Sequence, residues 1–266
     1  MSLPEALVDL QELTARLRHD CPWDREQTAK TIVPHTIEEA YEVADAALAD
    51  DDAKLLDEIG DLLFQSYFLA LLLEERGTGS LEAAARGIHA KLVARHPHVF
   101  GEVEAETAGR VRQNWERLKR EQEGREGIFH DVPESLPGLL QARKVQRRAA
   151  AVGFDYPDVA TALADLEDEL RELRAELPAE EPLPETEPVQ RVADELGDAL
   201  FACVNVARKL NVDPELALRA ATGRFRARVE TAAALAERDG ERWIELPLAA
   251  QDDYFDRAKT TEVEGR

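Results

Sequence analysis

The sequence predicts an all-α protein made of two related helical halves, and three observations support this fold class. Apolar residues recur at three- and four-residue intervals along most of the 266 residues, which is the period of a helix with one buried face. Alternating apolar and polar residues, the pattern of a half-buried strand, are absent. Several motifs of the first half return in the same order in the second half, as expected for a tandem repeat.

The expected helices are separated by residues that interrupt helical structure. Asp213-Pro214 begins one helix, because aspartate caps a helix N-terminus and proline fits the first helical position. Breaks are expected at Cys21-Pro22, Pro34, Gly77 to Gly79, Pro97, Gly124 to Gly127 and the loop 178–188. The expected helices cover residues 4–18, 37–49, 53–75, 81–95, 108–122, 135–150, 159–177, 189–210, 214–237 and about 247–260.

Charge and hydropathy exclude several classes of partner. The 33 basic and 55 acidic residues give a formal net charge of −22, which repels nucleic acid and anionic lipid. The most apolar stretch, 62–73, is too short for the roughly 20 residues that cross a bilayer. The acidic, amphipathic N-terminus does not resemble a signal peptide. We therefore expect a cytoplasmic protein that binds neither nucleic acid nor membrane.

The repeat indicates two divergent copies of one helical domain. Trp23-Asp24 is echoed by Phe154-Asp155 at an offset of 131 residues (154 − 23). The other pairs are Glu39 and Glu42 with Glu169 and Glu172, Glu58-Ile-Gly-Asp61 with Glu195-Leu-Gly-Asp198, Lys91 and Arg95 with Arg224 and Arg228, and Trp115 and Lys119 with Phe255 and Lys259. We expect domains at 1–125 and 126–266, linked at about 124–134.

Paired carboxylates are the feature of each copy that points to chemistry. Glu39 and Glu42 share one helical face, and Glu58 and Asp61 share another, in a helix whose apolar residues make unpaired carboxylates costly. Acidic pairs are often only solvated helix faces, but two facing pairs that recur in a second copy favour a site for a hard cation. Magnesium fits this ligand set, and manganese would bind the same ligands. The corresponding ligands of the second copy are Glu169, Glu172, Glu195 and Asp198.

These carboxylates also carry a resemblance to a known family. Glu38-Glu39-x-x-Glu42, fifteen further residues and Glu58-x-x-Asp61 resemble the signature of the MazG nucleoside triphosphate pyrophosphohydrolases. Cys21-Pro-Trp-Asp24, Arg95-His-Pro-His-Val-Phe100 and Val152-Gly-Phe-Asp155 resemble other segments of its tandem-domain members. The resemblance implies an all-α, Mg²⁺-dependent, dimeric enzyme that cleaves a nucleoside triphosphate between the α and β phosphates, releasing a monophosphate and pyrophosphate.

Roles for the remaining candidates follow from this implied reaction. Glu172, Glu195 and Asp198 would be the catalytic residues, acting through a water activated by the metal. Basic side chains would clamp the outer phosphates and aromatic rings would stack on the base. The substrate-binding candidates are Glu38, Lys54, Lys91, Arg95, Trp115 and Lys119 in the first copy, and Asp168, Arg191, Asn205, Arg224, Arg228, Phe255 and Lys259 in the second.

The second copy is expected to be the main catalytic site, although the first keeps all five acids. Asn205, seven residues after Asp198, offers a polar group for a sugar or base, whereas the first copy has Phe68 there. In resembling family members this asparagine belongs to the nucleotide pocket. Against this, Asp168 replaces the family's first glutamate.

Two other functions remain open from the sequence. A catalytically vestigial, nucleotide-binding or regulatory dimer would release no pyrophosphate with any metal. A different Mg²⁺-dependent phosphohydrolase would release orthophosphate or another product. If the enzyme is a pyrophosphohydrolase, nucleotide-pool sanitation or regulation is its expected role.

Overall fold

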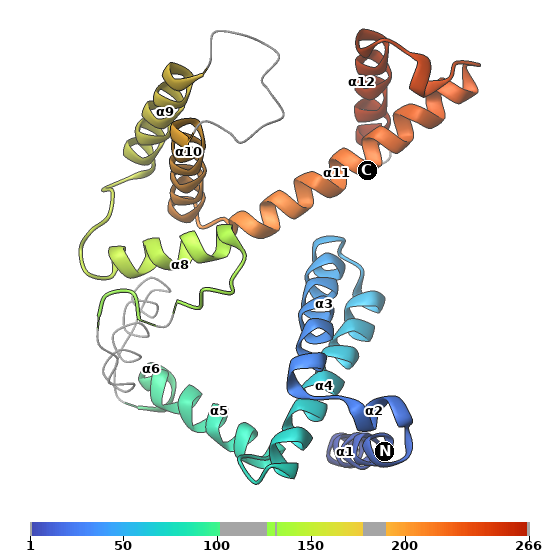
Figure 1. Ribbon diagram of the computed structural model, residues 1–266, viewed down its shortest axis with the longest axis vertical. Helices are drawn as coiled ribbons and strands as arrows, with labels where there is room; N and C mark the ends of the chain where they lie inside the picture. Colours follow the sequence, from blue (N-terminus) through green and yellow to red (C-terminus); the bar gives the residue numbers. More distant parts are fainter. Residues whose placement is uncertain (1, 102–126, 131, 178–189, 265–266) are drawn as a thin grey trace. The chain divides into compact units, whose positions relative to one another are not determined.

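The computed structural model describes residues 2–101, 127–130, 132–177 and 190–264. Within these ranges the regular structure is entirely helical, which confirms the all-α prediction (Figure 1). None of the helices in the described ranges is long and apolar enough to cross a bilayer. The expected helix 108–122 and the expected loop 178–188 lie outside the described residues.

The chain divides into two compact units, Met1–Glu126 and Gly127–Arg266. Helices of the first unit are α1 (Leu3–Asp20), α2 (Pro22–Glu26), α3 (Ala29–Leu48), α4 (Asp52–Glu75), α5 (Leu81–Arg95) and α6 (Pro97–Phe100). Helices of the second unit are α8 (Gly138–Ala150), α9 (Val159–Glu176), α10 (Gln190–Lys209), α11 (Pro214–Arg238), the 3-10 helix η1 (Trp243–Glu245) and α12 (Leu248–Glu264).

Local capping explains where several of these helices begin. The Asp51 carboxylate accepts a hydrogen bond from the backbone N–H of Lys54 at 3.0 Å, which starts α4. Asp213 caps α11 in the same way, with Pro214 at the first helical position as expected. Asp50 adopts a left-handed φ of 54° in the turn before α4. This short turn makes α3 and α4 antiparallel.

Pro34 does not end a helix, and the expectation of a break there is wrong. α3 begins at Ala29 and continues through Pro34 to Leu48. An internal proline removes one backbone hydrogen bond and costs about 3 kcal/mol. Ile32, one turn into the helix, is 2% exposed and packs against α4, so tertiary burial offsets this cost.

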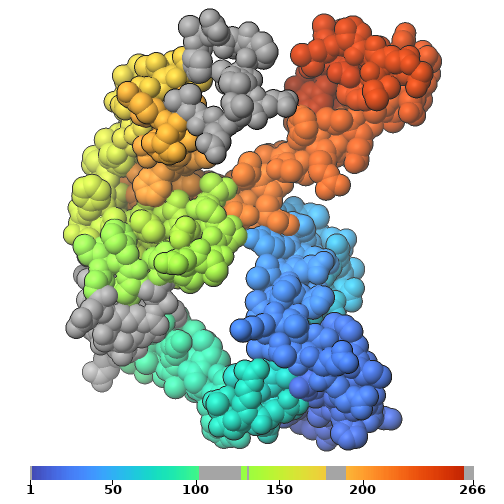
Figure 2. All heavy atoms as spheres, viewed as in Figure 1, coloured from blue at the N-terminus to red at the C-terminus, as the bar shows by residue number. Residues whose placement is uncertain are grey.

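The most extensively packed helix pair is α3 with α4 in the first unit and α9 with α10 in the second. In the first unit Phe68 and Leu72 of α4 pack with Ile32 of α3 to form a buried cluster. Figure 2 shows α3 and α4, coloured blue to cyan, as one continuous body. Small residues replace this cluster in the second pair, where Ala162 and Ala202 are buried. The carboxylate pairs lie on these two helix pairs.

Candidate metal centre

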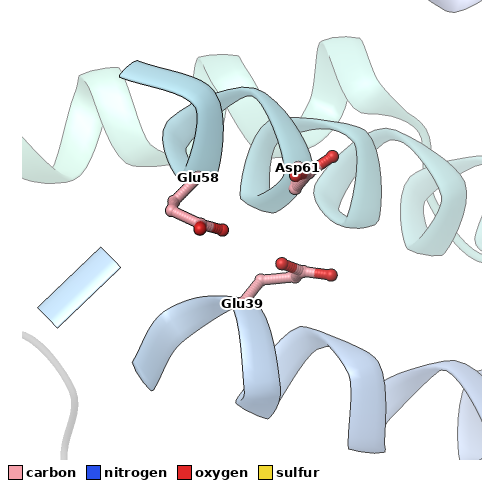
Figure 3. Close-up of side chains that lie close together, drawn as sticks. All are labelled: Glu39, Glu58 and Asp61. Atoms are coloured by element: carbon pink, nitrogen blue, oxygen red, sulfur yellow. The ribbon is translucent and has the colours of Figure 1, made fainter. Parts of the chain in front are cut away.

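The first unit brings together one carboxylate of α3 and two of α4. Oxygens of Glu39, Glu58 and Asp61 all lie within 4.8 Å of one another, and we call these residues the first carboxylate cluster. Figure 3 shows Glu39 on one helix facing Glu58 and Asp61 on the other. The i, i+3 spacing puts the two α4 residues on one face, and the antiparallel packing of α3 places Glu39 opposite them.

The second unit repeats this arrangement between α9 and α10. Oxygens of Glu169, Glu195 and Asp198, the second carboxylate cluster, also lie within 4.8 Å of one another. Corresponding positions of the two copies therefore form corresponding clusters. Clusters of three oxygen ligands fit a hard cation such as Mg²⁺, which takes a few carboxylates and completes its shell with water or phosphate.

Two further predicted ligands flank the clusters. Glu42 hydrogen-bonds to the Glu58 carboxyl group, and its charge also acts on Glu39. The charge of Glu172 likewise acts on Glu169. Glu42 and Glu172 lie outside the 4.8 Å groupings, so their role as ligands stays a prediction.

Burial, together with neighbouring negative charge, raises the pKa of Glu39, Glu58 and Glu169. Burial is the largest cause of the raised pKa of Glu58, followed by the charge of Glu42. Burial is also the largest cause of the raised pKa of Glu39, followed by the charge of Asp61. The pKa of Glu169 is raised by burial first and by the charge of Asp198 second. A bound cation would relieve this repulsion, because it adds positive charge where negative charges are desolvated.

Replacing Glu58 with glutamine should raise the melting temperature of the metal-free protein at pH 7. The pKa of Glu58 is raised above 4.5 in the folded state, so the folded protein binds a proton more tightly than the unfolded chain does. The free energy of unfolding therefore falls as the pH rises from 4.5 through the folded-state pKa. The gain in the variant should disappear below pH 4.5, where the wild-type carboxyl is protonated in both states. Thermal unfolding by circular dichroism measures both. The exposed neighbour Asp57→Asn is the control, and an equal gain there would contradict the explanation.

The two basic residues predicted beside the clusters differ in their partners. The Lys54 ammonium, predicted to bind substrate phosphates, lies 3.6 Å from the Glu58 carboxylate. Arg191 instead pairs with Glu176 of α9 at 2.6 Å, although it occupies the equivalent helix position. Lys54 therefore pairs with a member of the first carboxylate cluster, whereas Arg191 pairs with a residue outside the second cluster.

The other predicted substrate residues lie on other helices or at the edges of the clusters. Lys91 and Arg95 lie on α5, while Arg224 and Arg228 lie on α11. Phe255 of α12 packs 5.7 Å from Phe225, with the Lys259 ammonium 4.8 Å from its ring centroid and paired with Asp256. Glu38 lies 3.8 Å from His35, and Asp168 pairs with Arg171. Trp115 and Lys119 lie outside the described residues. The substrate roles of all these residues stay predictions.

Asn205 is held by an ion-pair network at the end of α10. Its Oδ1 accepts a hydrogen bond from Arg208 Nε at 3.1 Å, and Arg208 and Lys209 both pair with Asp155. Arginine only donates hydrogen bonds, so its partner atom on Asn205 must be the oxygen. An Asn205 side chain held in this way would offer its NH₂ group as the hydrogen-bond donor to a ligand. The network thus connects the Phe154-Asp155 motif to the predicted nucleotide residue.

Sequence reasoning missed two polar groups beside the clusters. Gln65, one turn after Asp61, is 8% exposed, and its Oε1 has no hydrogen-bond partner in the described part of the chain. Tyr156 hydrogen-bonds to Asp165, which with burial raises the pKa of Tyr156 to about 12. The helical spacing of Gln65 from Asp61 was visible in the sequence, but its burial without a partner was not.

Comparisons with known proteins identify the family of this chain. Residues 27–100, which include the first carboxylate cluster, match the MazG nucleotide pyrophosphohydrolase domain. The nucleoside triphosphate pyrophosphohydrolase/pyrophosphatase MazG of Thermotoga maritima is 37% identical over 96% of this chain and 95% of its own. The nucleoside triphosphate pyrophosphohydrolase of Escherichia coli K12 is 35% identical over 99% of this chain and 100% of its own. A crystal structure of a mazG-related protein from Thermotoga maritima aligns with 42% of this chain and 97% of that chain, at 28% identity and a TM-score of 0.38.

Proposed function

The chain belongs to the MazG family, and from this premise we propose that it hydrolyses nucleoside triphosphates to monophosphates and pyrophosphate with Mg²⁺ as cofactor. The observation that carries the proposal is the recurrence of the same three-carboxylate cluster in both units. Manganese would fit the same ligands. A role in nucleotide-pool sanitation or regulation, and a cytoplasmic location, fit this activity.

The carboxylates supply what such a reaction needs from the protein. Phosphoryl transfer depends on positioning and charge neutralisation more than on a protein nucleophile. When bound, Mg²⁺ supplies a positive charge for the phosphates and lowers the pKa of the attacking water. Glu195 and Asp198 lie on one face of α10, and Glu169 faces them from α9, so helix packing places the three carboxylates together.

The products and their dependence on cations test the proposal. We expect a nucleoside monophosphate and pyrophosphate as the first products, and no turnover after chelation, because carboxylates alone would repel the phosphates and would not activate a water. Chromatography of the nucleotides, with a pyrophosphate-specific assay, measures both. Initial formation of nucleoside diphosphate and orthophosphate would identify a different phosphohydrolase. Nucleotide binding without any product would identify a vestigial regulatory protein.

We also propose that the protein forms a homodimer. Leu56 and Ile59 of α4 are 73% and 48% exposed, and Leu196 and Leu200 of α10 are 48% and 52% exposed. Burying such leucines typically contributes about 1.5 to 3 kcal/mol each, which favours association of these helices with a second copy.

Light scattering should give the mass of a dimer at micromolar concentration. Leu56→Glu should shift the equilibrium toward monomer, because a buried charge without a partner is costly in an interface. The exposed Leu3→Glu on α1 is the control for an added charge alone. A wild-type monomer throughout the micromolar range would refute the dimer.

A further inference from the structure

Gln65 has a buried side chain whose carbonyl oxygen makes no hydrogen bond within the described ranges. The residue is 8% exposed, and its Oε1 is inaccessible to solvent. Leaving a buried polar atom unsatisfied is costly, and native proteins rarely do so without a ligand or a functional reason. The position of Gln65 beside the first carboxylate cluster suggests such a reason.

The contacts on either side of Gln65 show which way this face of α4 points. Asp61, one turn earlier, belongs to the cluster with Glu39 of α3, and Phe68, about one turn later, packs on Ile32 of α3. Residues four apart on a helix share a face, so Gln65 faces α3 between the carboxylates and the apolar core. Its Cα lies about 6 Å along the helix from that of Asp61.

In the second unit the corresponding amide side chain, that of Asn205, lies about one helical turn farther from the carboxylates than Gln65 does in the first. Ala202 occupies the position equivalent to Gln65, and Asn205 the position equivalent to Phe68. Ala202 and Phe68 are both buried and apolar. The cluster-bearing face of each helix, α4 or α10, therefore carries one amide side chain. Its Cα lies about 6 Å along the helix from that of Asp61 in the first unit, and about 10 Å from that of Asp198 in the second.

We propose that the first unit holds a nucleotide site of its own, in which the Gln65 side chain turns from its enclosed position toward the cluster and accepts a hydrogen bond at Oε1 from a sugar hydroxyl. This inference rests on the proposed function, which places the phosphates at the carboxylate cluster. The sugar is the part of the nucleotide next to the α phosphate, so a side chain one turn from the cluster meets it first. The more distant Asn205 would donate to a different part of the nucleotide.

An aromatic pair lies at the N-terminal part of α3, on the N-terminal side of Glu39. Trp23 is 53% exposed and meets His35 edge to face, with ring centroids 5.9 Å apart. His35 precedes Glu39 by four residues and so shares its helix face. A base attached to a sugar at Gln65 could stack on these rings.

Nucleotide binding to the full chain tests this site. A Glu195→Gln/Asp198→Asn double variant disables the second cluster, so that binding of α,β-methylene-ATP with Mg²⁺ reports on the first unit. We expect calorimetry to give one site per chain in this variant and two in the wild type. Adding Gln65→Met, which keeps the length of the side chain, should weaken the remaining site about tenfold, as for loss of one buried hydrogen bond.

Stability and analogues separate a binding role from a structural one. Without nucleotide, Gln65→Met should leave the melting temperature unchanged or higher, because an unsatisfied buried amide is removed. Gln65→Ala, which copies the second unit, should weaken binding in the same way. Gln146→Met removes another buried glutamine, one that donates to the Phe201 carbonyl at 2.8 Å, and should not change nucleotide affinity in the first unit.

The proposal fails if the double variant binds no nucleotide while the wild type binds one, a result that leaves the proposed function intact. It also fails if Gln65→Met lowers the melting temperature and leaves affinity unchanged. The 2′-deoxy and 3′-deoxy analogues locate the hydroxyl, because the Gln65 effect should vanish for one of them. An equal effect on both analogues would overturn the sugar assignment. Failure of the proposed function itself would instead appear as no binding and no pyrophosphate in the wild type.

Discussion

Replacing Glu195 or Asp198 with alanine should lower the rate of nucleoside triphosphate hydrolysis by about a thousandfold. Each change removes a carboxylate from the second cluster, and losing cation-based charge stabilisation costs about 4 kcal/mol of barrier. Glu58→Ala or Asp61→Ala should cost less. The Lys54 ammonium already contacts Glu58 in the first cluster, and the wholly buried Phe68 occupies the position that Asn205 has in the second unit.

Initial rates at saturating Mg²⁺ and nucleotide measure this difference between the units. Circular dichroism must show that each variant is folded, and relief of carboxylate repulsion should leave it at least as stable as the parent without metal. Added Mg²⁺ should then stabilise the variant less than the parent. If folded Glu58→Ala and Asp61→Ala variants lose as much activity as the second-unit variants, both units or a coupling between them must be catalytic.

Replacing Arg18 with methionine should destabilise the first unit by about 2 kcal/mol, the second large effect we expect. The guanidinium donates to both Glu75 oxygens at 2.8 and 2.9 Å, and to the backbone carbonyls of Arg25 and Gln27 at 2.9 and 3.0 Å. It also lies 5.9 Å from the Phe68 ring centroid. One side chain thus joins α1 to α4 and to the end of α2.

Urea unfolding at pH 7 measures this loss. The hydrogen bond from Arg18 holds the pKa of Glu75 below its ordinary value of 4.5, so the stability from this pair is present above that pH and is lost as the pH falls through the folded pKa. The difference between variant and wild type should shrink accordingly in acid. Arg16→Met is the matched control, because its 3.4 Å pair with Asp20 is 80% and 59% exposed and contributes little. Equal losses in both variants would contradict the role given to Arg18.

The sequence was sufficient for most of the described helices and for the three members of each carboxylate cluster, although it also placed Glu42 and Glu172 among the ligands. Helical periodicity is a local property, and the described helices from α1 to α12 largely follow the expected ranges. The i, i+3 spacing of Glu58 and Asp61 fixes their common face in any helix. Even the opposing helix could be anticipated, because the turn between α3 and α4 is too short for another arrangement.

Tertiary contacts decided what local spacing leaves open. Pro34 stays inside α3 because burial of Ile32 outweighs one lost hydrogen bond. Arg191 turns to Glu176 although its position in the helix repeats that of Lys54. In the sequence, Gln65 and Asn205 are both polar residues on the cluster-bearing face of a helix. In the described part of the structure, packing leaves Gln65 Oε1 without a hydrogen-bond partner, whereas Asn205 Oδ1 accepts a hydrogen bond from Arg208. A partner across a helix interface depends on how two distant segments pack, and no periodicity within one segment encodes it.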